Sequence, residues 1–233
     1  MKKPYVKKLD TIGDVVVWEV DGEYVRGHMN EEFTNFGQHE RFPFIPSREV
    51  WIDHECVSGE QAFFTHHLLT ERRLMRSGMS YARALAYADR AERSERKKSV
   101  VMKRLRSKKI TPESLAKIYK KKLATYANGL TVWLVRGELV RDICFIDYTE
   151  GGHDYVYPFV PANEVWIDDD LKQSERPFVL LHEVHERRLM SDGMDYHRAH
   201  HSASLLEQGC RKRPSSLVAR LKKEVALNTL KTK

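Results

Sequence analysis

The stretch Pro43-Phe-Ile-Pro-Ser-Arg-Glu-Val-Trp-Ile-Asp53 recurs 115 residues further on as Pro158-Phe-Val-Pro-Ala-Asn-Glu-Val-Trp-Ile-Asp168. The same shift gives 32 identities without a gap across the 76 positions from Val17 to Glu92. Chance matching at average composition would give about 5. The period is too long for a solenoid, and two copies are too few for an array. The sequence therefore predicts two tandem copies of one domain.

Each copy has the same order of expected elements. Val15–Val20 and Glu23–Arg26 are β-rich runs around Asp21-Gly22, which predicts a β-hairpin, and Arg136-Gly137 is a weaker form of that turn. The short strand Glu-Val-Trp-Ile-Asp follows, and then about sixteen residues with helical periodicity. A second helix comes next, and its expected N-caps are Ser80 and Asp195. We expect an α+β fold in which each unit is a β-hairpin plus further strands, followed by a helical hairpin.

Basic charge is concentrated after each unit. The segment 93–122 carries a net charge of +11 and the segment 208–233 a net charge of +7, whereas the whole chain carries only +7. We expect a first unit at 1–92, a basic helical linker at 93–129, a second unit at 130–207 and a basic C-terminal extension at 208–233. Such extensions can follow the phosphates of a nucleic acid or bind another polyanion.

Two basic triplets are the candidate nucleic-acid contacts, because both follow the last helical residues that the copies share. They are Arg96, Lys97 and Lys98 in the first extension and Arg211, Lys212 and Arg213 in the second. The alternative is that the lysines are merely solvated and the linker is an amphipathic helix. Its inward residues would be Val101, Leu105, Leu115 and Ile118.

Composition excludes several classes of protein. The chain is 41% hydrophobic, which is enough for a core, and no stretch approaches the roughly 18–20 apolar residues that span a bilayer. The basic start is not followed by the apolar run of a secretory signal. The spacing of Cys56, Cys144 and Cys210 fits neither a zinc clip nor a disulfide framework. We expect a reducing, cytoplasmic location and no membrane partner.

The differences between the copies indicate where chemistry is placed. Both copies keep a His–Glu pair, His67 and Glu71 in the first and His182 and Glu186 in the second. Other polar residues occur only in the second copy, where the first has Gln, Leu, Thr or Ala. They are His153, Glu183, His185, His197, His200 and His201. If the chain has a chemical site, we expect it in the second copy, with the first copy degenerate.

Helical spacing brings three of these side chains together. His182 and Glu186 are four residues apart and share a helix face. His200 lies on the following helix at a position where the first copy has Leu85, which predicts an inward direction. His197 and His201 replace alanines away from that stripe and are expected to be exposed.

The segment His182-Glu-Val-His-Glu186 resembles the H-E-x-x-H helix of zincin metallopeptidases, with a carboxylate in place of the second histidine. The resemblance implies Zn²⁺ or a similar divalent metal, with His182 and Glu186 as ligands and Glu183 as the catalytic general base. His200 would be a third ligand, and water would take the fourth position. The larger pattern of Gly-Gly-His, Pro-Phe-Val-Pro and His-Glu-x-x-Glu-Arg resembles an uncharacterised phage and bacterial domain, which implies no activity.

Several alternatives stay open. The first copy keeps its His–Glu pair without the other ligands, so the pair could be a structural hydrogen bond. His153 is either a further ligand or substrate contact, or a loop histidine. Asp168-Asp-Asp170 is interpreted as structural, and Trp51 and Trp166 as core. Two functions follow: a metal-dependent, metallopeptidase-like hydrolase, or a non-enzymatic nucleic-acid-binding or regulatory protein that uses its basic extensions.

Overall fold

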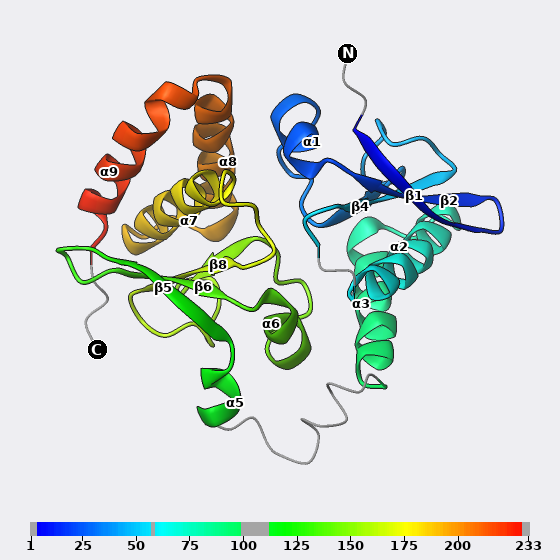
Figure 1. Ribbon diagram of the computed structural model, residues 1–233, viewed down its shortest axis with the longest axis horizontal. Coiled ribbons are helices and arrows are strands. Elements are labelled where there is room, and N and C mark those ends of the chain that lie inside the picture. Colours follow the sequence, from blue (N-terminus) through cyan, green and yellow to red (C-terminus); the bar gives the residue numbers. More distant parts are fainter. Residues whose placement is uncertain (1–3, 57–58, 99–111, 230–233) are drawn as a thin grey trace. The chain divides into compact units, whose positions relative to one another are not determined.

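The computed structural model describes residues 4–56, 59–98 and 112–229, and it is an α+β fold with two similar halves (Figure 1). The chain divides into two compact units. One contains Met1–Thr111 and Arg141–Asp147, and the other contains Pro112–Val140 and Tyr148–Lys233. Each unit is described by itself below.

Each unit is built on a four-stranded sheet with the same topology. The first sheet has the order β1-β2-β4-β3 and the second the order β5-β6-β8-β7. In both sheets, the second strand in sequence pairs antiparallel with the first and parallel with the fourth, so that β2 lies between β1 and β4, and β6 between β5 and β8. The strands are β1 (Tyr5–Ile12), β2 (Val15–Val20), β3 (Phe36–Gln38), β4 (Glu49–Asp53), β5 (Tyr119–Thr125), β6 (Thr131–Val135), β7 (Gly151–His153) and β8 (Glu164–Asp168).

A helical hairpin follows the last strand of each sheet, as predicted. Ser80 and Asp195 occupy the N-cap positions of the second helices, and the Asp195 side chain accepts from the Arg198 N–H. The helices are α1 (Gly22–His28), α2 (Gln61–Arg76), α3 (Tyr81–Arg96), α5 (Pro112–Ala116), α6 (Gly137–Ile143), α7 (Arg176–Ser191), α8 (Tyr196–Lys212), the 3₁₀ turn η1 (Pro214–Ser216) and α9 (Leu217–Leu227).

The central tryptophan of each sheet is buried, which confirms the prediction of core residues. Trp51 is 2% exposed and its Nε1 donates to Glu49, which also accepts from the Tyr5 hydroxyl at 2.8 Å. Trp166 is 1% exposed, and the same pattern joins it to Glu164 and Tyr119. The apolar ring is removed from water while its N–H keeps a partner, so burial of each tryptophan leaves no unpaired donor.

The predicted hairpin at Asp21-Gly22 is wrong, because helix α1 starts there. The Asp21 side chain accepts from the Tyr24 N–H and caps the helix. A Cβ at Gly22 would lie 1.7 Å from an Asp53 carboxylate oxygen, so glycine is needed for a close approach and not for a turn. Gly137 meets Asp168 in the same way at the start of α6. The antiparallel partner of β2 is instead the strand that precedes it.

The segment 93–129 is not a helical linker throughout, which corrects a second expectation. Strand β5, with its exposed Lys120, Lys121 and Lys122, forms the edge of the second sheet. Lysines on an edge strand discourage pairing with another chain, so part of the basic charge has a local structural use. Ile118 is buried and Leu115 half-buried, whereas Val101 and Leu105 lie outside the described residues.

The C-terminal extension is part of the second unit. Leu221 and Val225 of α9 pack into the core cluster that contains Val179 and Val184 of α7. Asn228 donates to the Val184 carbonyl at 2.8 Å and fixes the end of α9. Apolar residues at helical spacing therefore connect α9 to α7, and the side chains of Lys222 and Lys223 on α9 are exposed. Among the described residues, none of the helices combines the length and apolar character needed to cross a bilayer.

Candidate metal centre

Three side chains from two helices converge in the second unit. His182 and Glu186 lie one turn apart on α7, and His200 faces them from α8. His200 Nδ1 lies 2.8 Å from Glu186 Oε2 and 3.1 Å from His182 Nε2. The distance between Glu186 Oε2 and His182 Nε2 is 3.7 Å. The inward direction expected for His200 is therefore observed, with its side chain 35% exposed at the surface end of the cluster.

The spacing of these three atoms matches the ligand shell of a small divalent cation. Ligands about 2.0–2.1 Å from a tetrahedral Zn²⁺ stand roughly 3.3 Å from one another. The observed separations, 2.8, 3.1 and 3.7 Å, bracket that value. In addition, His200 Nδ1 can hold only one hydrogen, so it cannot satisfy Glu186 and His182 together. A cation would satisfy all three atoms.

The second ring nitrogen of His182 is held by a carboxylate. His182 Nδ1 lies 3.0 Å from Glu207 Oε2, and the Arg211 guanidinium donates to the other Glu207 oxygen at 2.8 Å. Arg211 also donates to Glu175 at 3.0 Å. A histidine that ligates a metal usually donates its other N–H to a carboxylate, which orients the ring and raises its basicity. His182 therefore presents Nε2, and not Nδ1, to the cluster.

His153 supports Glu186 from the sheet side. It lies on strand β7 rather than in a loop, and it is fully buried. The backbone N–H of Tyr155 donates to His153 Nδ1 at 3.2 Å, which leaves the ring hydrogen on Nε2, 3.0 Å from Glu186 Oε1. Burial lowers the pKa of His153, so the neutral ring is favoured. In this arrangement His153 is a donor that positions Glu186, since a protonated nitrogen cannot ligate a metal.

Glu183 is a buried carboxyl beside the cluster. It is 9% exposed and accepts no hydrogen bond from any other residue in the part of the chain that the structure describes. Its oxygens come within 4.8 Å of ligand atoms of His153 and Glu186. Burial raises the pKa of Glu183 to about 8, and the neighbouring charge of Glu186 adds to the effect. Without a cation nearby, this carboxyl is largely protonated at neutral pH.

The first unit contains the same supporting network. His67 Nδ1 lies 2.9 Å from Glu92, and Arg96 joins Glu92 to Glu60. These residues stand 115 positions before His182, Glu207, Arg211 and Glu175 respectively. The network is therefore shared by both halves, and by itself it indicates structure rather than chemistry. Sequence comparison could have found Glu60, Glu175, Arg96 and Arg211 as a set, because all four are identical at the same shift.

The cluster itself is not shared. In the first unit, Gln38 takes the place of His153 and donates to Glu71 at 2.8 Å, so the carboxylate is still held. Leu85 stands at the His200 position and Leu68 at the Glu183 position. Leu68 is buried in the apolar core of that unit. The first unit thus keeps one histidine and one glutamate and lacks a third ligand.

Space near the cluster also differs between the halves. In the first unit, the rings of Phe36 and Phe64 pack 4.6 Å apart, and Phe36 lies 5.1 Å from the His67 ring. The second unit has Gly151 and Val179 at these positions. A Cβ at Gly151 would lie 2.9 Å from Glu183, so glycine is required beside this carboxyl. In the second unit, Gly151 and Val179 thus replace the two phenylalanines, and the Glu183 carboxyl lies beside Gly151. The alignment at a shift of 115 residues shows both replacements, but the sequence analysis did not use them.

The other histidines and acidic residues that the sequence singled out do not belong to the cluster of His182, Glu186 and His200. His197 and His201 are exposed, as expected. His185 lies outside the cluster, 2.9 Å from Glu224 on α9 and 3.0 Å from the Ser202 hydroxyl on α8. Asp168, Asp169 and Asp170 could also hold a cation by their spacing. However, Asp169 pairs with Lys120 and Asp168 accepts from the Asp170 N–H, which is in keeping with a structural role.

The two basic triplets are divided between buried and exposed side chains. Arg96 is 3% exposed and bonded to Glu60, Glu92 and Asp142, and the Arg211 side chain is 5% exposed. Burial in ion pairs removes both arginines from a surface that could follow phosphates. Arg96 belongs to α3 and Arg211 to α8, which corrects the expectation that the triplets come after the shared helical residues. Side chains of the other four residues, Lys97, Lys98, Lys212 and Arg213, are exposed.

His67 allows the hydrogen-bond network that both units share to be tested in the first unit, where leucines stand at the positions of His200 and Glu183. Burial would lower the pKa of His67, but the nearby carboxylates of Glu71, at 3.6 Å, and Glu92, at hydrogen-bond distance, outweigh burial and raise it to about 9. A raised pKa stabilises the fold fully below the unfolded value of about 6.5, and this contribution is lost as the pH rises through 9. The loss is on the order of 3 kcal/mol.

We expect the His67 ring resonance to titrate with a midpoint near 9 by NMR. We also expect urea unfolding to show the first unit weakening between pH 7 and 10. A His67→Gln variant should lack this part of the pH dependence. A midpoint below 7 would mean that the two carboxylates do not hold a charged imidazolium.

Searches against family models, curated proteins and solved structures find no match to this chain.

Proposed function

We propose that the chain consists of two tandem copies of one unit and is a cytoplasmic metal-dependent hydrolase of metallopeptidase-like type, with Zn²⁺ or a similar divalent metal in the second unit. One observation carries the proposal. One ligand atom each of His182, Glu186 and His200 lies at separations that suit a small cation. In addition, Glu207 accepts a hydrogen bond from the other ring nitrogen of His182.

The difference between the halves supports a metal over a structural hydrogen bond. A structural His–Glu pair explains His67 and Glu71, and it needs no further histidine. In the second unit, His200 stands where the first unit has a leucine, and it adds a third possible ligand atom at a part-exposed position. The Nδ1 atom of His200 faces both His182 Nε2 and Glu186 Oε2, whereas a structural His–Glu pair needs no such third side chain.

Glu183, His153 and Glu207 each have a proposed role in hydrolysis. A bound Zn²⁺ would act as a Lewis acid and lower the pKa of a coordinated water to about 7. Glu183 would accept the proton of the attacking water and later deliver it to the leaving group. His153 and Glu207 would hold Glu186 and His182 in orientation, and the cation's charge would favour the ionised form of Glu183.

The decisive experiment is metal analysis of the untagged full chain. We expect at most one divalent ion per chain by elemental analysis, and we expect His200→Leu, which copies the first unit, to abolish stoichiometric binding. His153→Gln is the matched control. It also copies the first unit, but it keeps an N–H donor toward Glu186, as Gln38 does toward Glu71, and should retain the ion.

The two variants separate the interpretations. Stoichiometric metal in the His200→Leu protein would exclude the proposed site, and two ions per chain would show that the halves do not differ. Complete absence of bound metal after supply of Zn²⁺, Mn²⁺ or Fe²⁺ would leave the His–Glu pairs as structural hydrogen bonds. The same analysis names the metal, since zinc, iron and manganese are read separately.

A further inference from the structure

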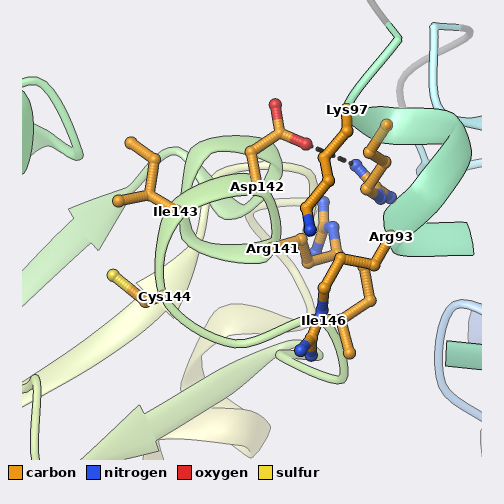
Figure 2. Close-up of a pocket in the computed structure, with 8 residues that line it drawn as sticks. Arg93, Lys97, Arg141, Asp142, Ile143, Cys144 and Ile146 are labelled. Carbon is orange, nitrogen blue, oxygen red and sulfur yellow. Dashed lines mark hydrogen bonds and ion pairs between the residues drawn. The ribbon is translucent and has the colours of Figure 1, made fainter. Parts of the chain in front are cut away.

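A cavity of about 210 Å³ lies beside the C-terminal end of α3 (Figure 2). Four basic side chains line it together with Asp142, two isoleucines and a cysteine. All of these residues belong to the first compact unit, 1–111 with 141–147. The basic residues are Arg93, Arg96, Lys97 and Arg141. Figure 2 shows Lys97 extending from α3 toward Arg141.

The positive charge of this cavity is only partly neutralised. Arg96 and Arg141 are buried and both contact Glu60, and Arg96 also pairs with Glu92 and Asp142. By contrast, Arg93 and Lys97 are exposed, and within the described part of the chain neither lies at ion-pair distance from a carboxylate, although the charge of Arg93 acts on the nearby Asp147 carboxyl. They stand four residues apart on one helix face, where like charges repel.

A second observation concerns Arg96, one of the residues that line the cavity. The Arg96 side chain is 3% exposed, yet its Nη2 atom has no hydrogen-bond partner in the part of the chain that the structure describes. A buried donor of a charged group without an acceptor is unfavourable. An anion in the cavity would offset the repulsion between Arg93 and Lys97 and would interact favourably with the charge of the Arg96 guanidinium in the cavity wall.

The second unit lacks this arrangement at the equivalent helix. Gln208 stands where α3 has Arg93, and it accepts a hydrogen bond from Lys212, the equivalent of Lys97, at 3.0 Å. The exposed pair of cations is therefore particular to the first unit. Since the two halves share the buried Arg–Glu network, that network does not require Arg93.

We propose that this cavity binds a phosphate-type oxyanion, with the exposed Arg93 and Lys97 as its direct contacts and the buried Arg96 and Arg141 in its wall. Guanidinium and ammonium groups that surround a small space suit a tetrahedral anion with several acceptor oxygens. The phosphate has two sources, a free phosphate or phosphate monoester, and the backbone of a nucleic acid. The site is independent of the metal centre proposed for the second unit.

The test is isothermal titration of the full chain with inorganic phosphate at constant ionic strength. The double variant Arg93→Gln/Lys97→Ala should bind at least about tenfold more weakly than the wild type, because two charge-assisted contacts are lost. Both side chains are exposed, so the fold should be unaffected. Lys212→Ala, at the equivalent position of the other unit, is the control and should bind phosphate as the wild type does.

Further arms identify the source. Competition with phosphate by a single-stranded oligonucleotide, lost in the double variant, assigns the site to nucleic-acid phosphate. Binding of phosphate and a mononucleotide without binding of the oligonucleotide assigns it to small phosphates. No binding of any of these ligands at low salt overturns the proposal, and so does equal weakening by Lys212→Ala.

Discussion

Replacing Glu183 with glutamine is expected to reduce hydrolysis by about 10²–10⁴ while leaving bound metal and fold intact. The amide keeps the size of the side chain, so it still fits beside Gly151. It cannot accept a proton from water at neutral pH, and that transfer is the role proposed for Glu183. Turnover of peptide, ester and phosphodiester substrates by the metal-loaded full chain, with metal content measured on the same sample, gives the comparison.

A second substitution separates a general base from a residue that only fills space. Glu183→Leu copies Leu68 of the first unit, where that side chain is buried in the apolar core. Both variants should be equally inactive if proton transfer is what is lost. If the glutamine variant turns over substrate at the wild-type rate, Glu183 has no part in the mechanism. If the wild type hydrolyses none of the three substrate classes, the enzyme proposal is weakened while the metal analysis stands.

The candidate site was predictable because it depends on helical spacing and on a comparison within the chain. The four-residue spacing of His182 and Glu186 fixes a shared face, and the leucine at the His200 position indicated an inward direction. Which partner each nitrogen takes was not predictable. The assignment of His153 as a donor to Glu186 depends on the backbone N–H of Tyr155, which no side-chain pattern encodes.

The first strand of each sheet was missed for a specific reason. Tyr5–Ile12 matches Tyr119–Thr125 at a shift of 114, and an additional residue before β6, in the turn that contains Gly129, restores the shift of 115. A comparison without gaps therefore lost the match ahead of Val17. The strand then seemed to belong to a basic linker, because three of its seven residues are lysines.

The β-hairpin predicted at Asp21-Gly22 was wrong for a different reason. Local turn preference favours a hairpin at Asp21-Gly22, but the actual constraint on Gly22 is a tertiary contact with Asp53. Arg26 then pairs with that same aspartate at 2.7 Å and fixes α1 against β4. Such contacts between residues far apart in sequence are invisible to local propensity.

Substitution of Arg211 with methionine is expected to destabilise the second unit by about 3–5 kcal/mol. Arg211 is buried between Glu175 and Glu207, and its removal leaves two carboxylates without their shared cation. Methionine keeps much of the volume and the contact with Phe178, so the loss reflects charge more than packing. Hydrogen exchange of the α7 amides measures the effect within the second unit, because exchange reports stability locally.

A substitution at the adjacent Lys212 is the control for the buried ion pairs of Arg211, because the Lys212 side chain is on the surface. Lys212 is exposed and bonded only to Gln208 among the described residues, so Lys212→Ala should change stability by less than about 0.5 kcal/mol. Arg211→Lys should lie between the two, because lysine keeps the charge but loses the fork that reaches both glutamates. The methionine variant should also weaken metal binding, since Glu207 orients His182. If Arg211→Met is as stable as Lys212→Ala, the buried ion pairs do not hold the helices together, and Arg211 becomes available again as a contact for polyanions.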